Sequence, residues 1–117
     1  MEILILGSND LTDDEKEITK QHAHLFAAVD TMTALAKEII QCLMMHKDFA
    51  LWLNHAQGNA YVAKTLALAR DQGADPVIIY SFLESPAEKE MLRICTEEGW
   101  EFLTFENFCK KYLTEDA

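Results

Sequence analysis

The sequence predicts an α/β fold in which a five-stranded, mostly parallel sheet lies between two layers of helices. The clearest support comes from residues 48–83, which read as strand, polar loop with glycine, amphipathic helix, glycine and second strand. Apolar strand-like runs also alternate with helical patterns along the whole chain, without repeats or linkers. A chain of 117 residues, half of them hydrophobic, is long enough for one domain spanning 1–117.

Five runs have the composition of strands. Nearly continuous apolar residues, as in the first run, are typical of strands that are covered on both faces of a parallel sheet. The predicted strands are Glu2–Leu6, Leu25–Val29, Phe49–Leu53, Pro76–Tyr80 and Glu101–Phe105.

Helix signals separate these strands. Thr12 and Glu15 form a capping box, Ser85 followed by Pro86 marks another helix start, and Gly73 and Gly99 suit the position just after a helix end. Asp30 or Thr31 can cap the second helix, whose apolar stripe runs through Leu35, Ile39, Cys42 and Leu43 with Ala36 and Ile40 beside it. The predicted helices cover Asp13–Gln21, Met32–Met45, a segment ending near Gln72, Pro86 to Gly99, and Glu106–Leu113.

This alternation leaves two strand orders open, a flavodoxin-like 2-1-3-4-5, which we prefer, and a Rossmann-like 3-2-1-4-5. In such sheets ligands bind beyond the carboxyl ends of the strands, where the strand order reverses. The first order places Gly7–Asp10 beside Asn54–Asn59, and the second places it beside Ser81–Ser85. The segment after the first strand belongs to the predicted site in both cases.

The candidate ligand-binding residues carry hydroxyl, amide and imidazole groups together with two glycines. Glycine lets backbone amides approach a ligand, which suits a phosphate, a sugar hydroxyl or an amide. The sequence contains neither GxGxxG nor GxxxxGK[ST], so tight turns are the alternative role for the glycines. His55, the one histidine of the site, has no evident Ser or Cys partner for general-base chemistry. The predicted residues are Gly7, Ser8, Asn9, Asp10, Asn54, His55, Gly58 and Asn59.

Histidine and cysteine patterns do not predict a metal site. His22 and His24 form an HxH pair before the second strand, where alternation would put both on one face, but a third ligand is not indicated. The three cysteines, Cys42, Cys95 and Cys109, contain no CxxC pair. We predict buried thiols in a reducing compartment.

Charge and hydropathy exclude further classes. Twenty acidic against ten basic side chains give a net charge of −10, which argues against general binding to nucleic-acid backbones. Solubility explains this charge, and a surface that meets a basic partner or mimics DNA is the alternative. Apolar runs are too short to span a membrane, and the N-terminal pattern is that of a strand, so we expect a cytoplasmic protein.

About a third of the chain carries a family-like pattern. The strand Phe49–Leu53 is followed by Gly58-Asn59-Ala60-Tyr61, by the Ala-rich turn Leu66–Ala69 and by Pro76–Ile79. This pattern resembles nucleoside 2-deoxyribosyltransferase-like proteins and related nucleotide-binding Rossmannoids, which implies a nucleotide or nucleoside ligand. The nucleophilic glutamate of that family falls near Val62, so the resemblance does not extend to the transferase or hydrolase activity.

The five βα units and the acidic balance also resemble a receiver domain. That family uses paired acidic residues after the first strand, an aspartate after the third and a lysine after the fifth; only Ser81, after the fourth strand, fits. The corresponding positions hold Ser8 and Asn9, Asn54, and Thr104 or Phe105. This resemblance implies a degenerate receiver that acts only through protein interactions.

The sequence therefore predicts a small cytoplasmic domain that binds a nucleotide or nucleoside-like ligand at the carboxyl ends of the strands, without strong catalysis. The alternative is a protein-interaction module of degenerate receiver type without a small-molecule ligand. A hydrolase or transferase using Asp10 is a third class. Any cofactor stays open, and so does the choice between a homodimer and another protein partner.

Overall fold

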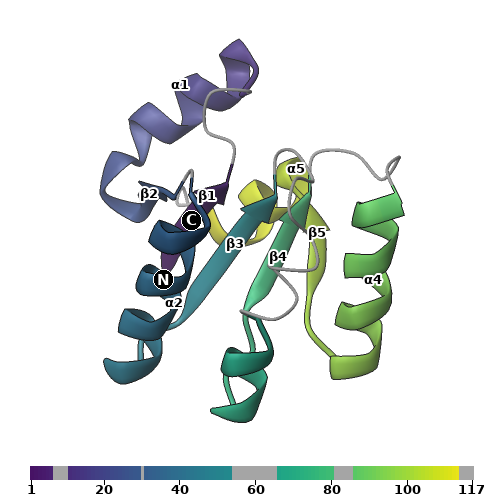
Figure 1. The fold of residues 1–117 in the computed structure, drawn as a ribbon. Helices are drawn as coiled ribbons and strands as arrows, with labels where there is room; N and C mark the ends of the chain where they lie inside the picture. The colour runs from purple at the N-terminus through teal and green to yellow at the C-terminus, as the bar shows by residue number, and fades with distance from the viewer. Residues whose placement is uncertain (7–10, 30, 54–65, 81–85, 114–117) are drawn as a thin grey trace.

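The computed structural model describes residues 1–6, 11–29, 31–53, 66–80 and 86–113, and within them one parallel sheet carries helices on both faces (Figure 1). The strand order is β2-β1-β3-β4-β5, which confirms the α/β class and the preferred order. The alternative order 3-2-1-4-5 was wrong, because β1 pairs with β3 as well as with β2. The strands are β1 Glu2–Leu6, β2 Phe26–Ala28, β3 Phe49–Leu53, β4 Val77–Tyr80 and β5 Phe102–Thr104.

The central strand β3 explains the unbroken apolar runs of the sequence. All five of its residues are buried, since helices cover both faces of the sheet. It pairs in register with β1 over its whole length, from Glu2 opposite Phe49 to Leu6 opposite Leu53. The first and third strands therefore end side by side at the carboxyl edge.

One face of the sheet is covered by α2 (Met32–Met44), by a helix over residues 66–71 and by α4 (Pro86–Glu98). The core on this side is mainly aliphatic. Leu35 and Ile39 of α2 are fully buried against Leu4 and Leu51, so the stripe predicted for α2 faces the sheet. Cys42 and Cys95 are buried in the same cluster.

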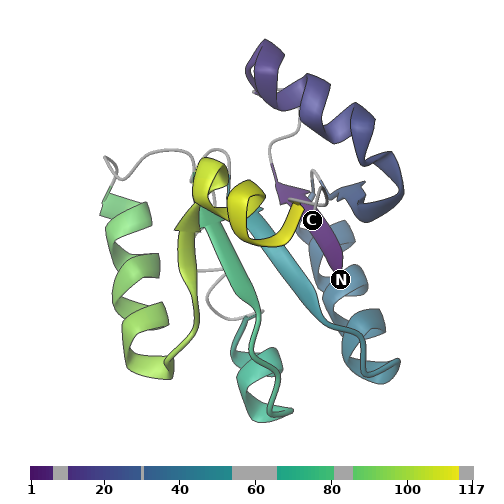
Figure 2. The same ribbon diagram turned by 180° about the vertical axis from the view of Figure 1, so that it is seen from behind.

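The opposite face is covered by α1 (Asp13–Gln21), α5 (Phe105–Phe108) and a π-helix over Cys109–Leu113, as Figure 2 shows. Its core combines aliphatic residues of the sheet with three buried aromatic rings, those of Trp52, Phe105 and Phe108. Trp52 is fully buried, stacks on Phe105 with ring centroids 3.9 Å apart, and lies 6.3 Å from the ring of Phe26. Helix α1 contributes only partly buried residues such as Ile18, in agreement with its thin apolar face.

Side-chain caps fix the starts of the helices. The backbone N–H of Glu15 donates to the hydroxyl of Thr12 (3.2 Å), and the Thr12 N–H donates to the Glu15 carboxylate (2.8 Å), which confirms the capping box. The Ala34 N–H donates to the hydroxyl of Thr31 (3.0 Å), so Thr31 is the cap of α2. Helix α4 begins at Pro86 as predicted, whereas its expected cap Ser85 lies outside the described residues.

Three helices in the described segments are followed by a residue with positive φ, in the left-handed backbone conformation. Gly73 and Gly99 both have φ of 76°, as expected for glycines that terminate helices. His46 takes the same role after α2 with φ of 53°, the only positive value found for a non-glycine residue in the described part of the chain. The Lys47 N–H donates to the carbonyl of Cys42 (2.9 Å) and closes that helix end.

Several predicted boundaries differ from the structure. The second strand begins at Phe26, because Ala23–Leu25 form a 3-10 turn, and strand alternation therefore does not apply to His22 and His24. The fifth strand ends at Thr104, one residue early. The Thr104 hydroxyl accepts a hydrogen bond from the Asn107 N–H (3.1 Å) and caps α5, which therefore begins at Phe105 rather than at Glu106.

Candidate functional site

The carboxyl edge of the sheet is the candidate site that the strand order selects. The order reverses at β1, since the chain goes from β1 outward to β2 and then back across to β3. Leu6 and Leu53, the last residues of β1 and β3, are register partners. Ligands of open α/β sheets bind at such a reversal.

The eight residues that the sequence nominates follow directly after these two strand ends. Gly7, Ser8, Asn9 and Asp10 come after Leu6, and the second group comes after Leu53. All of them lie outside the described residues, as do Val62 and Ser81. The second group consists of Asn54, His55, Gly58 and Asn59.

A cavity of about 530 Å³ lies between α1 and α5. It is lined by residues of α1 and by the first residues of α5, which directly follow the carboxyl end of β5. Its lining combines charged and apolar side chains: Asp14, Glu15, Ile18, Thr104, Phe105, Glu106, Cys109 and Lys110.

Four of the polar side chains that line this cavity have partners within the chain. The carboxylate of Glu15 and the hydroxyl of Thr104 cap α1 and α5, and the Lys110 ammonium lies 3.2 Å from the Glu106 carboxylate. Phe105 stacks on Trp52. The residues that line the cavity thus include helix caps and a ring that packs on the sheet. Its three carboxylates, those of Asp14, Glu15 and Glu106, outnumber its one ammonium group, that of Lys110.

The cysteine thiols are protonated at neutral pH. Burial, together with the Glu15 carboxylate, raises the pKa of Cys109 to about 11. Burial and Glu2 raise the pKa of Cys42 to about 11, and burial raises the pKa of Cys95 to about 12. Since the thiolate is the nucleophile, these environments do not activate a cysteine for covalent chemistry.

Trp52 carries a feature that the sequence did not predict. Trp52 lies inside β3 and is completely buried. Its indole N–H, however, is buried without a hydrogen-bond partner among the described residues. The sequence offered one signal for this unpaired N–H, namely that Trp52 is flanked within its strand by apolar residues. Such residues provide no side-chain acceptor for an indole N–H.

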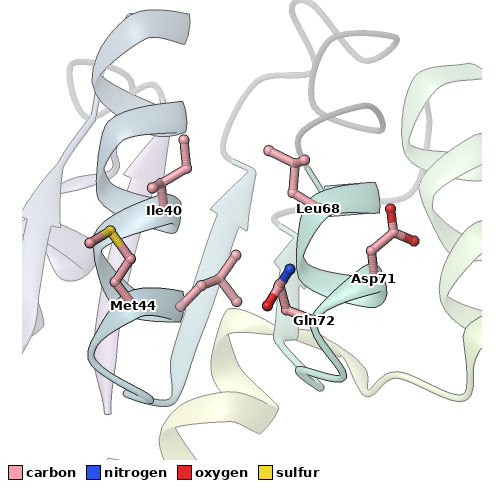
Figure 3. Close-up of a pocket in the computed structure, with 6 residues that line it drawn as sticks. Ile40, Met44, Leu68, Asp71 and Gln72 are labelled. Atoms are coloured by element: carbon pink, nitrogen blue, oxygen red, sulfur yellow. The ribbon is translucent and has the colours of Figure 1, made fainter.

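A second hollow lies on the other face, between α2 and the helix over residues 66–71 (Figure 3). It measures about 380 Å³, and Leu43 and Leu68 lie on its two sides. Its large apolar lining residues Ile40, Met44 and Leu68 are exposed. The sequence had marked Ile40 only as a flank of the buried stripe. The lining residues are Ile40, Leu43, Met44, Leu68, Asp71 and Gln72.

The histidines and acidic side chains do not assemble a metal site in the described part of the chain. Among the described residues, no three His, Cys, Asp or Glu side chains are grouped so that they could hold a metal ion. His22 ends α1 and His24 lies in the 3-10 turn that follows. None of the helices in the described segments has both the length and the apolar character needed to cross a membrane.

Comparisons with protein-family models, with curated proteins and with solved structures gave no match for this chain.

Proposed function

We propose that this protein is a small cytoplasmic domain that binds a nucleotide or nucleoside-like ligand at the carboxyl edge of its sheet, between β1 and β3, without strong catalysis. The ligand would contact backbone N–H groups at Gly7 and Gly58. Hydrogen bonds to its hydroxyl or base would come from Asn9, Asn54 and His55.

The observation that carries this proposal is the pairing of β1 with β3. Leu6 and Leu53, the residues that precede the two nominated segments in the sequence, are register partners where the strand order reverses. Folds of this kind bind ligands at such a reversal, which supports the proposal. The glycines and polar side chains of the two segments suit a phosphate or a sugar. All three cysteines are free thiols, which suits a reducing compartment.

A thermal-shift screen with nucleotides and nucleosides tests the proposal. A ligand that binds only the folded state adds about 2.7 kcal/mol of stability when it is present at one hundred times its dissociation constant. We therefore expect at least one member of the panel to raise the melting midpoint in proportion to the logarithm of its concentration. No response to any member would contradict the proposal.

Paired variants locate the site. Asn9→Ala and His55→Ala should abolish the midpoint shift, whereas Gln41→Ala should retain it. Gln41 is exposed on α2 and lies near the amino edge of the sheet, so it provides a matched loss of an amide side chain. A shift that survives both Asn9→Ala and His55→Ala would contradict the assigned residues.

A protein-interaction module is the second candidate, and the exposed apolar residues of α2 favour it. Ile40, Met44 and Met45 are all exposed on or directly after this helix. Exposed apolar patches of this kind mark interaction surfaces. A chain that responds to no nucleotide but forms a stable protein complex would support this function instead.

A further inference from the structure

The groove between α2 and the helix over residues 66–71 is the most apolar exposed feature of the described surface. Ile40 and Leu68 are each 44% exposed and Met44 is 76% exposed, although all three are large apolar side chains. Figure 3 shows Ile40 and Met44 on one side of the groove and Leu68 and Gln72 on the other. Such side chains lose contact with water when a partner covers them.

The groove and helix α2 are complementary to each other. Lys37, Ile40 and Met44 are spaced by three and four residues, so they share one face of α2. Ile40 lies level with Leu68, and Met44 lies level with Gln72 (Figure 3). Asp71 also lines the groove, on the side of its helix away from α2, and its carboxylate lies 3.6 Å from the Arg70 side chain. When two copies of α2 meet antiparallel, the Lys37 end of one copy reaches the Asp71 end of the other.

The charge distribution selects this face for self-association. The chain has a net charge of −10, and α1 and α4 each carry four acidic against two basic side chains. The charged residues of α2 are a single lysine, Lys37, and a single glutamate, Glu38. Two copies that meet through α2 therefore avoid the repulsion that α1 or α4 would bring, because like charges in contact oppose association.

We propose that a second copy of this chain occupies the groove, with two α2 helices antiparallel across a two-fold axis. Ile40 and Met44 of each copy enter the groove of the other. Lys37 of each copy faces Asp71 of the other, so the same surface serves on both sides as a two-fold interface requires. The apolar area is small, so the dimer is weak and depends on concentration. This proposal does not rest on the ligand site at the carboxyl edge.

A matched pair of methionine variants tests the proposal. Met44 and Met45 are neighbours and are both strongly exposed, at 76% and 64%, but only Met44 lines the groove. We expect Met44→Glu to raise the dimer dissociation constant at least about tenfold, because it places a carboxylate in the apolar contact. Met45→Glu introduces the same charge and should change the constant much less. Sedimentation equilibrium over a wide concentration range measures both.

Because both methionines are exposed, we expect neither substitution to disturb the folded state. Far-UV circular dichroism and thermal melting of the two variants check this. A wild-type chain that is monomeric at every concentration would overturn the proposal and leave a different protein as the occupant. A dimer that Met44→Glu does not weaken, or that both variants weaken equally, would overturn it as well, since the contact would then lie elsewhere.

A charge exchange tests the antiparallel arrangement. Lys37→Glu places two carboxylates opposite each other and should weaken the dimer about threefold or more. The double variant Lys37→Glu with Asp71→Lys restores opposite charges and should return the dissociation constant close to the wild-type value. A double variant that dimerises no more tightly than Lys37→Glu alone would contradict the antiparallel arrangement.

Discussion

The two faces of the sheet differ in their core residues and in the large apolar side chains that their helices leave exposed. On the face of α1 and α5, Trp52, Phe105 and Phe108 pack among aliphatic residues of the sheet. Tyr112 of the π-helix stacks on Phe108, with ring centroids 4.8 Å apart. On the face of α2 and α4 the core is aliphatic, and large apolar side chains remain exposed beside it. The exposed residues on this side are Ile40, Met44, Met45 and Leu68.

This difference is the basis for proposing two separate roles on one sheet. Burial against the sheet requires only the stripe of Leu35 and Ile39 on α2. The apolar residues beyond that stripe add little to the core of the monomer, so they are available to a partner. The proposed ligand site lies instead at the carboxyl edge, where β1 and β3 end together.

The largest effects should come from the cores of the two faces. Phe108→Ala removes a fully buried ring from the aromatic face and should cost about 3–5 kcal/mol of unfolding free energy. Ile39→Ala should cost about 2–5 kcal/mol on the other face. Ile40→Ala, the neighbouring exposed position, should cost about 1 kcal/mol or less. Denaturant titration measures all three. Equal losses for Ile39→Ala and Ile40→Ala would contradict the assignment of buried and exposed sides of α2.

The alkylation rates of Cys42 and Cys109, which lie on opposite faces of the sheet, give a second comparison. Raising the pKa of Cys42 and Cys109 from 9.0 to about 11 lowers the thiolate fraction at neutral pH about 100-fold. Alkylation of the native chain should therefore be slower than that of the unfolded chain by at least this factor. Mass spectrometry of timed samples measures the rates, and rapid native labelling of either cysteine would contradict the buried environments.

The same shifts make stability depend on pH. Above pH 9.0 the unfolded chain loses thiol protons that the folded chain retains, so the unfolded state binds fewer protons and stability falls as pH rises. Cys42→Ala with Cys95→Ala should remove much of this dependence between pH 9.0 and about 11. An unchanged slope in the double variant would assign the dependence to other groups.

The helix ends on the face of α2 should give effects of about 1 kcal/mol. Gly99 has φ of 76°, and a Cβ at this position would meet open space, so Gly99→Ala should cost about 1 kcal/mol from backbone conformation alone. His46→Gly should have the opposite sign and stabilise the chain by up to about 1 kcal/mol. Chemical denaturation of both variants measures the pair. Destabilisation by His46→Gly would show that the imidazole makes a compensating contact.

The smallest effect should come from the ion pair that links the helix over residues 66–71 to α4. The Arg70 guanidinium lies 3.2 Å from the Glu98 carboxylate, at an exposed position. Arg70→Gln should lower the melting midpoint slightly at low salt, and the difference should disappear at high salt because exposed pairs are screened. A loss that persists at high salt would indicate a packing role for the arginine stem.

The sequence predicted the architecture well because each element carries its own local signal. The apolar run Glu2–Leu6, the capping box of Thr12 and Glu15 and the glycines Gly73 and Gly99 all have the predicted roles. The choice of strand order required the pairing of β1 with both β2 and β3, which long-range packing decides.

Other features could not be predicted from local patterns. Thr104 is both the last residue of β5 and the cap of α5. Its hydroxyl accepts a hydrogen bond from the Asn107 N–H, so α5 begins earlier than the sequence predicted. The edge strand β2 is shorter than predicted, because Leu25 belongs to the preceding 3-10 turn and not to the strand. The exposure of Ile40 depends on the position of the neighbouring helix, which periodicity alone does not give. The nominated ligand residues stay predictions.

A nuclear magnetic resonance titration tests the proposed ligand site most directly. Backbone amide shifts of the labelled chain are followed while the nucleotides and nucleosides of the thermal screen are added. The account predicts the largest changes at Leu6, at Leu53 and in the segments that follow them, with little change at Phe49 and Val77 on the amino edge. Changes concentrated at the amino edge or along the α2 groove, or no changes with any compound, would contradict it.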